Sequence, residues 1–177
     1  MRIEDKIVEA QPGEFVRRFD PKLRIVLAGR GWEIVAMSQL AQTADCELVV
    51  ASQEPATLEF CRPYADQLIQ LTVPRAVPEL PLDADTAVAC LFHEHEWEGQ
   101  LLLNALRSPA FYIGALGSRQ TQRRRIEVLE ALGATPEEIE RLKGPIGLFP
   151  SQDPRSLAVS ALAEIVKVRT AARGGVQ

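Results

Sequence analysis

The chain has 177 residues, of which 46% are apolar and 25% are charged, and its formal net charge is −4. This length favours one globular domain with a substantial core, and the negative charge argues against general binding of nucleic acid. No apolar run approaches the roughly 20 residues that span a bilayer, and the first residues lack the pattern of a signal peptide. The three cysteines follow no CxxC pattern. We therefore expect a cytoplasmic protein without disulfides or membrane contacts.

Strand and helix patterns alternate along the chain. Short runs rich in β-branched residues predict buried strands, and apolar residues at three- and four-residue spacing predict helices. The expected elements are strands at 23–28, 47–51, 68–71, 86–92 and 111–114, an edge strand at 146–148, helices at 32–43, 97–106, 120–132 and 154–170, a helix opened by Pro55 and a short helix capped by Thr135. The alternation predicts an α/β, Rossmann-like, doubly wound and mainly parallel sheet with helices on both faces.

The domain organisation follows from the same patterns. Residues 1–21 are polar and predict a lead-in segment, residues 22–170 a single domain, and residues 171–177 a frayed tail. Residues 74–85 carry three prolines and several acids, which predicts a loop or crossover.

The first predicted strand ends in a glycine turn, Gly29-Arg30-Gly31, just before a predicted helix. Glycines at such a junction permit a tight turn and let backbone amides approach a phosphate at the helix N-terminus. The third small position of the dinucleotide fingerprint is Ile34, so the fingerprint is incomplete. The turn predicts an anion site, and a purely conformational role of the glycines remains the alternative.

The end of the second predicted strand lacks the acid that usually binds the ribose hydroxyls of NAD. Ala51 or Ser52 occupies that position, the nearest acid is Glu54, and no arginine follows at once to favour a 2′-phosphate. Ordinary NAD(P) binding is therefore disfavoured. Ser52 is a candidate contact to another ligand, although a solvated loop residue is the favoured interpretation.

The fourth predicted strand ends at His93-Glu94-His95-Glu96, where ligands of open α/β sheets usually bind. If the strand stays extended, His93 and His95 project to one side and could donate two ligands to a metal. A zinc site would need further ligands from elsewhere, so hydrogen bonds to a polar ligand are favoured over metal binding. An equally acceptable explanation of the segment is that the histidines are merely exposed and that the acids stabilise the start of the next helix.

A second glycine-rich turn follows the fifth predicted strand. Its glycines permit close approach to a ligand, its serine can cap the next helix, and free amides beside an arginine predict an anion pocket. The candidate contacts are Gly114, Gly117, Ser118 and Arg119. Of the arginines that follow, Arg123 shares a helical face with Arg119, whereas Arg124 and Arg125 are expected to face solvent.

Several of these segments together resemble the Rossmann domain of the XdhC/CoxI family. The matching segments are Gly29-x-Gly31, the strand ending at His93 with His95 behind it, Phe111 to Arg119, Pro145-Ile146-Gly147-Leu148, and Leu157 to Ile165. The resemblance implies a cofactor-binding chaperone, more a carrier than an enzyme, that helps mature a xanthine-dehydrogenase-type molybdenum hydroxylase. It implies molybdenum cofactor (molybdopterin) as the ligand, a cysteine desulfurase as a second partner and, at the family level, a homodimer.

We predict cofactor contacts at the two glycine turns and at the ends of the second and fourth predicted strands, and we assign no catalytic or metal-binding residue. The proposed contacts are Gly29, Gly31, Ser52, His93, His95, Gly114, Gly117, Ser118 and Arg119. The chain departs from the family pattern at the first glycine turn, where Arg30, Trp32, Glu33 and Ile34 replace small or apolar residues. We also expect no counterpart of the cysteine-containing N-terminal domain of longer members. The alternatives are an NAD(P)-binding oxidoreductase and a ligand-free Rossmann interaction module.

Overall fold

The computed structural model describes residues 21–74, 80–93 and 95–173. Within these residues one six-stranded parallel sheet has the order β3-β2-β1-β4-β5-β6. The strands are β1 (Leu23–Gly29), β2 (Cys46–Ser52), β3 (Gln67–Gln70), β4 (Thr86–Leu91), β5 (Tyr112–Ala115) and β6 (Leu142–Lys143). The helices are α1 (Trp32–Ala41), α2 (Pro55–Cys61), α3 (His95–Arg107), α4 (Arg119–Ala131), α5 (Pro136–Glu140) and α6 (Pro154–Ala172), and a short 3-10 helix, η1 (Gln42–Ala44), follows α1.

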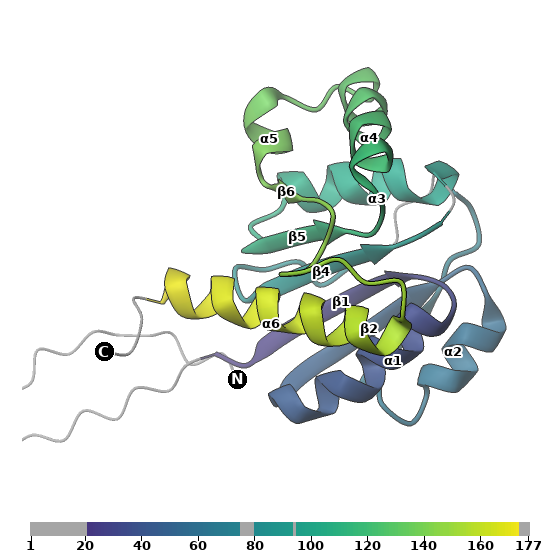
Figure 1. The fold of residues 1–177 in the computed structure, drawn as a ribbon. Helices are drawn as coiled ribbons and strands as arrows, with labels where there is room; N and C mark the ends of the chain where they lie inside the picture. Colours follow the sequence, from purple (N-terminus) through teal and green to yellow (C-terminus); the bar gives the residue numbers. More distant parts are fainter. Residues whose placement is uncertain (1–20, 75–79, 94, 174–177) are drawn as a thin grey trace, which may run out of the picture.

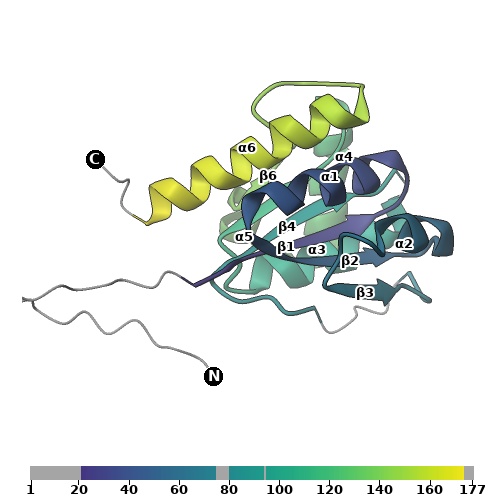
Figure 2. The same ribbon diagram turned by 90° about the horizontal axis from the view of Figure 1, so that it is seen from below.

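Helices cover both faces of the sheet, with α1, α2 and α6 on one face and α3 and α4 on the other (Figures 1 and 2). Successive residues of a strand point to opposite faces. Ile25 and Leu27 therefore pack against the α1 and α6 layer, whereas Val26 and Ala28 pack against the α3 layer. Because central strands are buried on both faces, they read as continuous apolar runs. The predicted doubly wound, Rossmann-like fold is confirmed.

Local sequence signals set the helix starts. The Ser118 hydroxyl caps α4, and the Asp153 carboxylate caps α6. Thr135 and Glu138 form the reciprocal capping box of α5, and Pro55 occupies the first turn of α2. The caps predicted at Ser118 and Thr135 and the helix start predicted at Pro55 are confirmed.

The expected edge strand at 146–148 was wrong, because the edge strand is β6 and residues 146–148 form a loop. Gly147 has a φ of +104° and donates its amide hydrogen to the Glu164 carboxylate at 2.8 Å, which directs the chain toward α6. The end of the chain also differs from expectation, since α6 continues to Ala172. Residues 1–20 of the predicted lead-in and 174–177 of the predicted tail lie outside the described residues.

The expected extended His93-x-His95 segment was also wrong. Strand β4 ends at Leu91, and α3 begins at His95, so the two histidines do not share one side of a strand. His93 lies in the connection, and His95 is the first residue of a helix.

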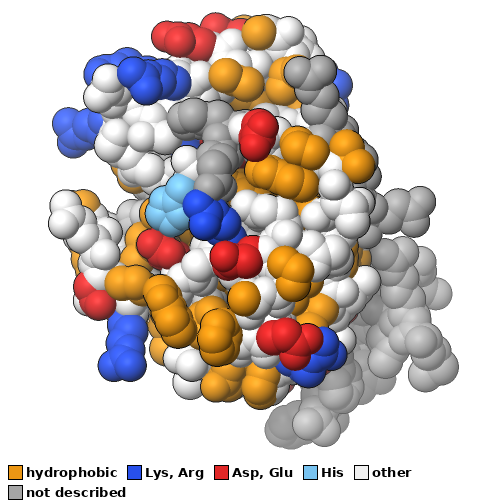
Figure 3. All heavy atoms as spheres, turned by 90° about the vertical axis from the view of Figure 1, so that its right-hand side faces the viewer, with side chains coloured by type: hydrophobic (Ala, Val, Ile, Leu, Met, Phe, Trp, Pro, Cys, Tyr) orange, Lys and Arg blue, Asp and Glu red, His pale blue; other side chains and the backbone are white. Residues whose placement is uncertain are grey.

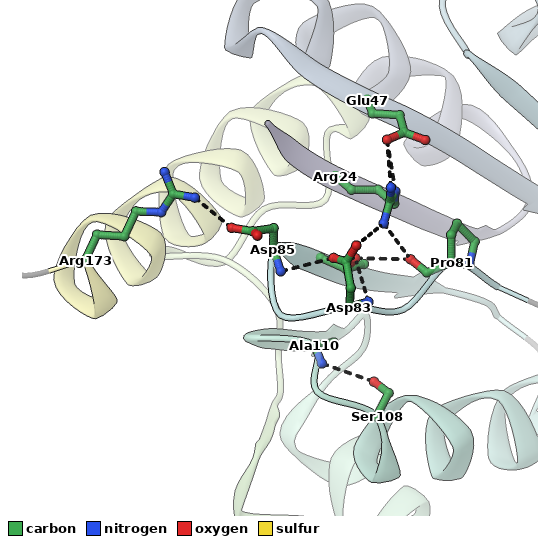
Figure 4. Close-up of polar contacts among 9 residues, drawn as sticks. Arg24, Glu47, Pro81, Asp83, Asp85, Ser108, Ala110 and Arg173 are labelled. Atoms are coloured by element: carbon green, nitrogen blue, oxygen red, sulfur yellow. Dashed lines mark hydrogen bonds and ion pairs between the residues drawn. The ribbon is translucent and has the colours of Figure 1, made fainter. Parts of the chain in front are cut away.

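Ion pairs close the amino edge of the sheet (Figure 4). The Arg24 guanidinium on β1 contacts Glu47 on β2 at 2.9 Å and Asp83, just before β4, at 2.6 Å. Arg173, after the end of α6, contacts Asp85 at 2.6 Å. These charged side chains pair with one another at the amino ends of the strands. The carboxyl edge, at the other end of the strands, is where ligands of open α/β sheets bind.

Candidate functional site

The carboxyl ends of β1, β4 and β5 define the candidate site. The strand order reverses between β1 and β4, and ligands of open α/β sheets bind in the crevice at such a switch point. Figure 3 looks onto this side of the molecule and shows a histidine side chain among basic and acidic ones, with hydrophobic side chains gathered below them.

The first glycine turn is held by contacts within the protein. A Cβ atom on Gly29 would lie 2.4 Å from the Leu91 carbonyl oxygen, so glycine is required for the turn to pass the end of β4. The Gly31 amide donates a hydrogen bond to Thr57 Oγ1 at 3.1 Å, and this hydroxyl donates in turn to the Glu54 carboxylate. An amide expected to hold a phosphate is therefore already used by the chain itself.

Glu33, in the first turn of α1, lies over this glycine turn. Its Oε2 atom is 3.3 Å from the position of a Cβ on Gly31, and its Oε1 atom is 3.5 Å from His93 Nε2. The Glu33 side chain is 19% exposed and that of His93 is 50% exposed. Helical side chains lean toward the N-terminus, which places this carboxylate at the positive end of α1. The sequence analysis did not include Glu33 among the site residues. The signal that could have found it is an acidic residue in the first turn of a helix that follows a glycine turn.

The other large residues of the turn point elsewhere. Trp32 stacks on Phe60 of α2 at the surface, with ring centroids 5.4 Å apart, and Ile34 is fully buried in the core. The Glu33 carboxylate, by contrast, contacts His93 at the switch point.

The second glycine turn lies at the end of β5. Gly117 has a φ of +141°, and a Cβ atom there would lie 2.8 Å from Thr121 Cγ2, so this position requires glycine. Ser118 Oγ accepts the Thr121 amide hydrogen at 3.1 Å. The amides of Arg119 and Gln120 have no carbonyl partner inside the helix, because they belong to its first turn. These donors and the exposed Arg119 side chain form a geometry suited to an anion.

A pocket of about 380 Å³ lies between the second glycine turn and residues 145–151, called here the rim loop. The rim loop carries Leu148 and Phe149, which are each about half exposed, at the pocket wall. Sequence reasoning placed a strand here and so missed this wall.

Helix α6 holds the rim loop by side-chain hydrogen bonds. Glu164 accepts from the Gly147 amide at 2.8 Å and from the Tyr112 hydroxyl at 2.5 Å. Ser160 Oγ accepts from the Phe149 amide at 2.9 Å and donates to the Phe149 carbonyl at 2.8 Å. Burial and the hydrogen bond to Glu164 raise the pKa of Tyr112 well above its ordinary value, so the phenol stays a donor.

A buried ion pair lies beneath the second glycine turn. Arg125 donates from Nε to Glu98 Oε1 at 2.7 Å and from Nη2 to the Leu116 carbonyl at 2.5 Å. The two charged side chains are 2% and 4% exposed. The prediction that Arg125 faces solvent was wrong. Arg125 lies one helical turn before the buried Leu129, and this spacing is the signal that could have placed it inside.

Two of the sequence-predicted contacts do not reach the surface of the edge. Ser52 is fully buried, and its hydroxyl accepts the Glu54 amide hydrogen at 3.1 Å. A Cβ atom on Gly114 would lie 2.6 Å from the Tyr112 hydroxyl, so this glycine serves packing. The His95 side chain lies outside the described part of the structure. We therefore leave Ser52 and Gly114 out of the proposed site.

Within residues 21–74, 80–93 and 95–173, no three histidine, cysteine, aspartate or glutamate side chains are grouped so that they could hold a metal ion. The helices of the same residues include none with the length and apolar character needed to cross a bilayer.

A comparison with known protein families shows to which family this chain belongs. The family described as the XdhC Rossmann domain matches residues 25–165. The chain belongs to this family. This XdhC domain is 32% identical over 152 residues to the molybdenum cofactor insertion chaperone PaoD of Escherichia coli (strain K12), covering 85% of the chain and 42% of the relative. It is 30% identical over 161 residues to a probable subunit of xanthine dehydrogenase from Bacillus subtilis (strain 168), covering 88% of the chain and 46% of the relative.

A solved structure supports the fold. The crystal structure of a xanthine dehydrogenase from Bacillus halodurans matches with a TM-score of 0.72 and 24% sequence identity, over 85% of this XdhC domain and 44% of that chain. The chain thus spans less than half the length of the relatives and of the structure that it matches.

Proposed function

We propose that this XdhC domain binds molybdenum cofactor and acts as a carrier in the maturation of a xanthine-dehydrogenase-type molybdenum hydroxylase. The names of two relatives support the role, since one is a molybdenum cofactor insertion chaperone and the other a probable subunit of xanthine dehydrogenase. The observation that carries the proposal is the pocket between the second glycine turn and the rim loop, at the carboxyl edge of the sheet.

The chemistry of the pocket suits molybdopterin, which joins a planar amino-pyrimidinone ring, fused to reduced rings, to a terminal phosphate. The first-turn amides of α4 and the Arg119 guanidinium are donors for the phosphate. Phe149 and Leu148 offer an apolar wall beside them, which suits the face of a ring. We place the carrier in the cytoplasm, with a cysteine desulfurase as sulfur donor and a homodimer as its assembly, as the family resemblance implies.

Titration of the purified protein with molybdenum cofactor under anaerobic conditions tests the proposal. Arg119→Ala should weaken binding by roughly tenfold to a hundredfold, the worth of one charged hydrogen bond. Arg124→Ala is the matched control, because it removes the same charge from an exposed position on the same helix. Mass spectrometry of the native protein should detect bound pterin. A wild-type protein that binds no cofactor, or equal losses in the two variants, would refute the proposed site.

A further inference from the structure

The first glycine turn disfavours phosphate binding, although its backbone makes the tight turn expected from the sequence. The Gly31 amide is engaged by Thr57, and the Glu33 carboxylate lies at the positive end of α1. An incoming phosphate would meet a negative charge where a dinucleotide fold usually offers free donors. The two glycine turns therefore differ in chemistry, because a carboxylate lies at the helix start after the first, whereas the amides of the first turn of α4 and the Arg119 side chain lie at the second.

A carboxylate at this edge of the sheet can bind a ligand that presents two parallel N–H groups on one edge of a ring. The amino-pyrimidinone ring of a pterin has this edge, with a ring N–H beside an exocyclic amino group. The two oxygens of a carboxylate can accept both hydrogens at once, in the fork geometry that it forms with a guanidinium. His93 Nε2 lies 3.5 Å from Glu33 Oε1, which is within the range of an ion pair but too long for a strong hydrogen bond that would compete with a ligand.

We infer that Glu33, oriented by His93, recognises the amino-pyrimidinone edge of the pterin and thereby fixes the direction of the bound cofactor. The ring edge lies at the first glycine turn, and the phosphate lies at Gly117, Ser118 and Arg119. This inference rests on the proposed function, since it takes the ligand to be a phosphorylated pterin.

The sheet sets the distance between the two ends. Strand β4 lies between β1 and β5, and His93 follows β4, between the two turns. Neighbouring strands are about 4.8 Å apart, so the turns after β1 and β5 are separated by roughly 10 Å. A pterin with a phosphate on its side arm is of this size. The same ligand can therefore contact Glu33 at one end and Arg119 at the other.

Two fluorescent probes that differ at a single edge test the inference. They are the monophosphates of 6-hydroxymethylpterin and 6-hydroxymethyllumazine, of which the second carries a carbonyl where the first carries the amino group. Wild-type protein should bind the pterin about tenfold to a hundredfold more tightly, because the carbonyl would face the carboxylate. Glu33→Gln should abolish most of this preference. Glu130→Gln, an exposed position on α4 that changes the net charge equally, should retain it.

The outcomes separate this inference from the function on which it rests. Equal affinity of wild-type protein for the two probes, with molybdenum cofactor still bound, overturns the assignment of the ring edge and leaves the carrier role standing. A preference that survives in Glu33→Gln overturns it as well, because another group would then recognise the ring. Absence of cofactor binding by the wild type overturns the carrier role, and this inference with it. The wild-type comparison decides the matter even if a variant folds poorly.

Discussion

Replacing Arg125 with methionine should destabilise this XdhC domain by about 3–5 kcal/mol, because the change removes the guanidinium that contacts the buried Glu98 carboxylate at 2.7 Å. The Glu98 side chain is 4% exposed, so water cannot take the place of the lost guanidinium. The neighbouring Cys90 cannot balance the charge, because burial raises the pKa of its thiol and the neutral S–H group donates only a weak hydrogen bond to Glu98, at 4.0 Å. The Leu116 carbonyl loses a donor in the same step.

Urea denaturation followed by circular dichroism measures this loss, and thermal unfolding should show a fall in Tm of roughly 6–20 °C. Arg124→Met, at an exposed position, should change stability by less than about 0.5 kcal/mol. The double variant Glu98→Leu/Arg125→Met removes both charges and should recover most of the stability. A single variant that loses less than about 1 kcal/mol, or a double variant no more stable than the single, would show that Arg125 does not stabilise the buried Glu98 charge.

Tyr112→Phe should cost about 1.5–3 kcal/mol near neutral pH, because it removes a hydrogen bond to the Glu164 carboxylate. The pKa of Tyr112 is raised in the folded state by burial and by Glu164, so the unfolded chain loses this proton first and wild-type stability falls as the pH rises above about 10. Urea midpoints over this range should fall less steeply for the phenylalanine variant, and parallel curves would contradict the assignment. Gly147→Ala should lose about 1–3 kcal/mol from backbone strain, and more from the new Cβ atom, which would lie 2.5 Å from Ser160 Oγ. Gly133→Ala shares the positive φ but has open space around its Cβ position, so equal losses of Tm in these two variants would exclude the clash.

The fold was predictable because its signals are local. β-Branched runs marked the buried strands, and residues such as Pro55, Ser118 and Thr135 marked helix starts within one turn of themselves. The second glycine turn was also predictable, because the need for glycine at position 117 arises from the backbone and from a residue four positions later.

The unpredicted parts depend on partners far away in the sequence. The rim loop reads as a strand until Glu164 and Ser160 are known to hold it against α6. Arg125 stands in a run of arginines typical of a solvated surface, and its burial depends on a partner for its charge, Glu98 on another helix, which the sequence does not reveal. The sequence shows that Glu33 departs from the family pattern, but not that it lies beside His93, which the sheet brings next to it from the connection after β4.

The attachment of the rim loop to α6 determines how cargo can enter and leave. Four hydrogen bonds tie Gly147, Leu148 and Phe149 to Glu164 and Ser160, and at about 1 kcal/mol each they leave the loop detached in roughly one molecule per thousand. The rim loop is therefore in place in nearly all molecules at any moment. Exchange then proceeds through the open mouth of a preformed cavity, and the time for which a cargo is retained is set by its own contacts there.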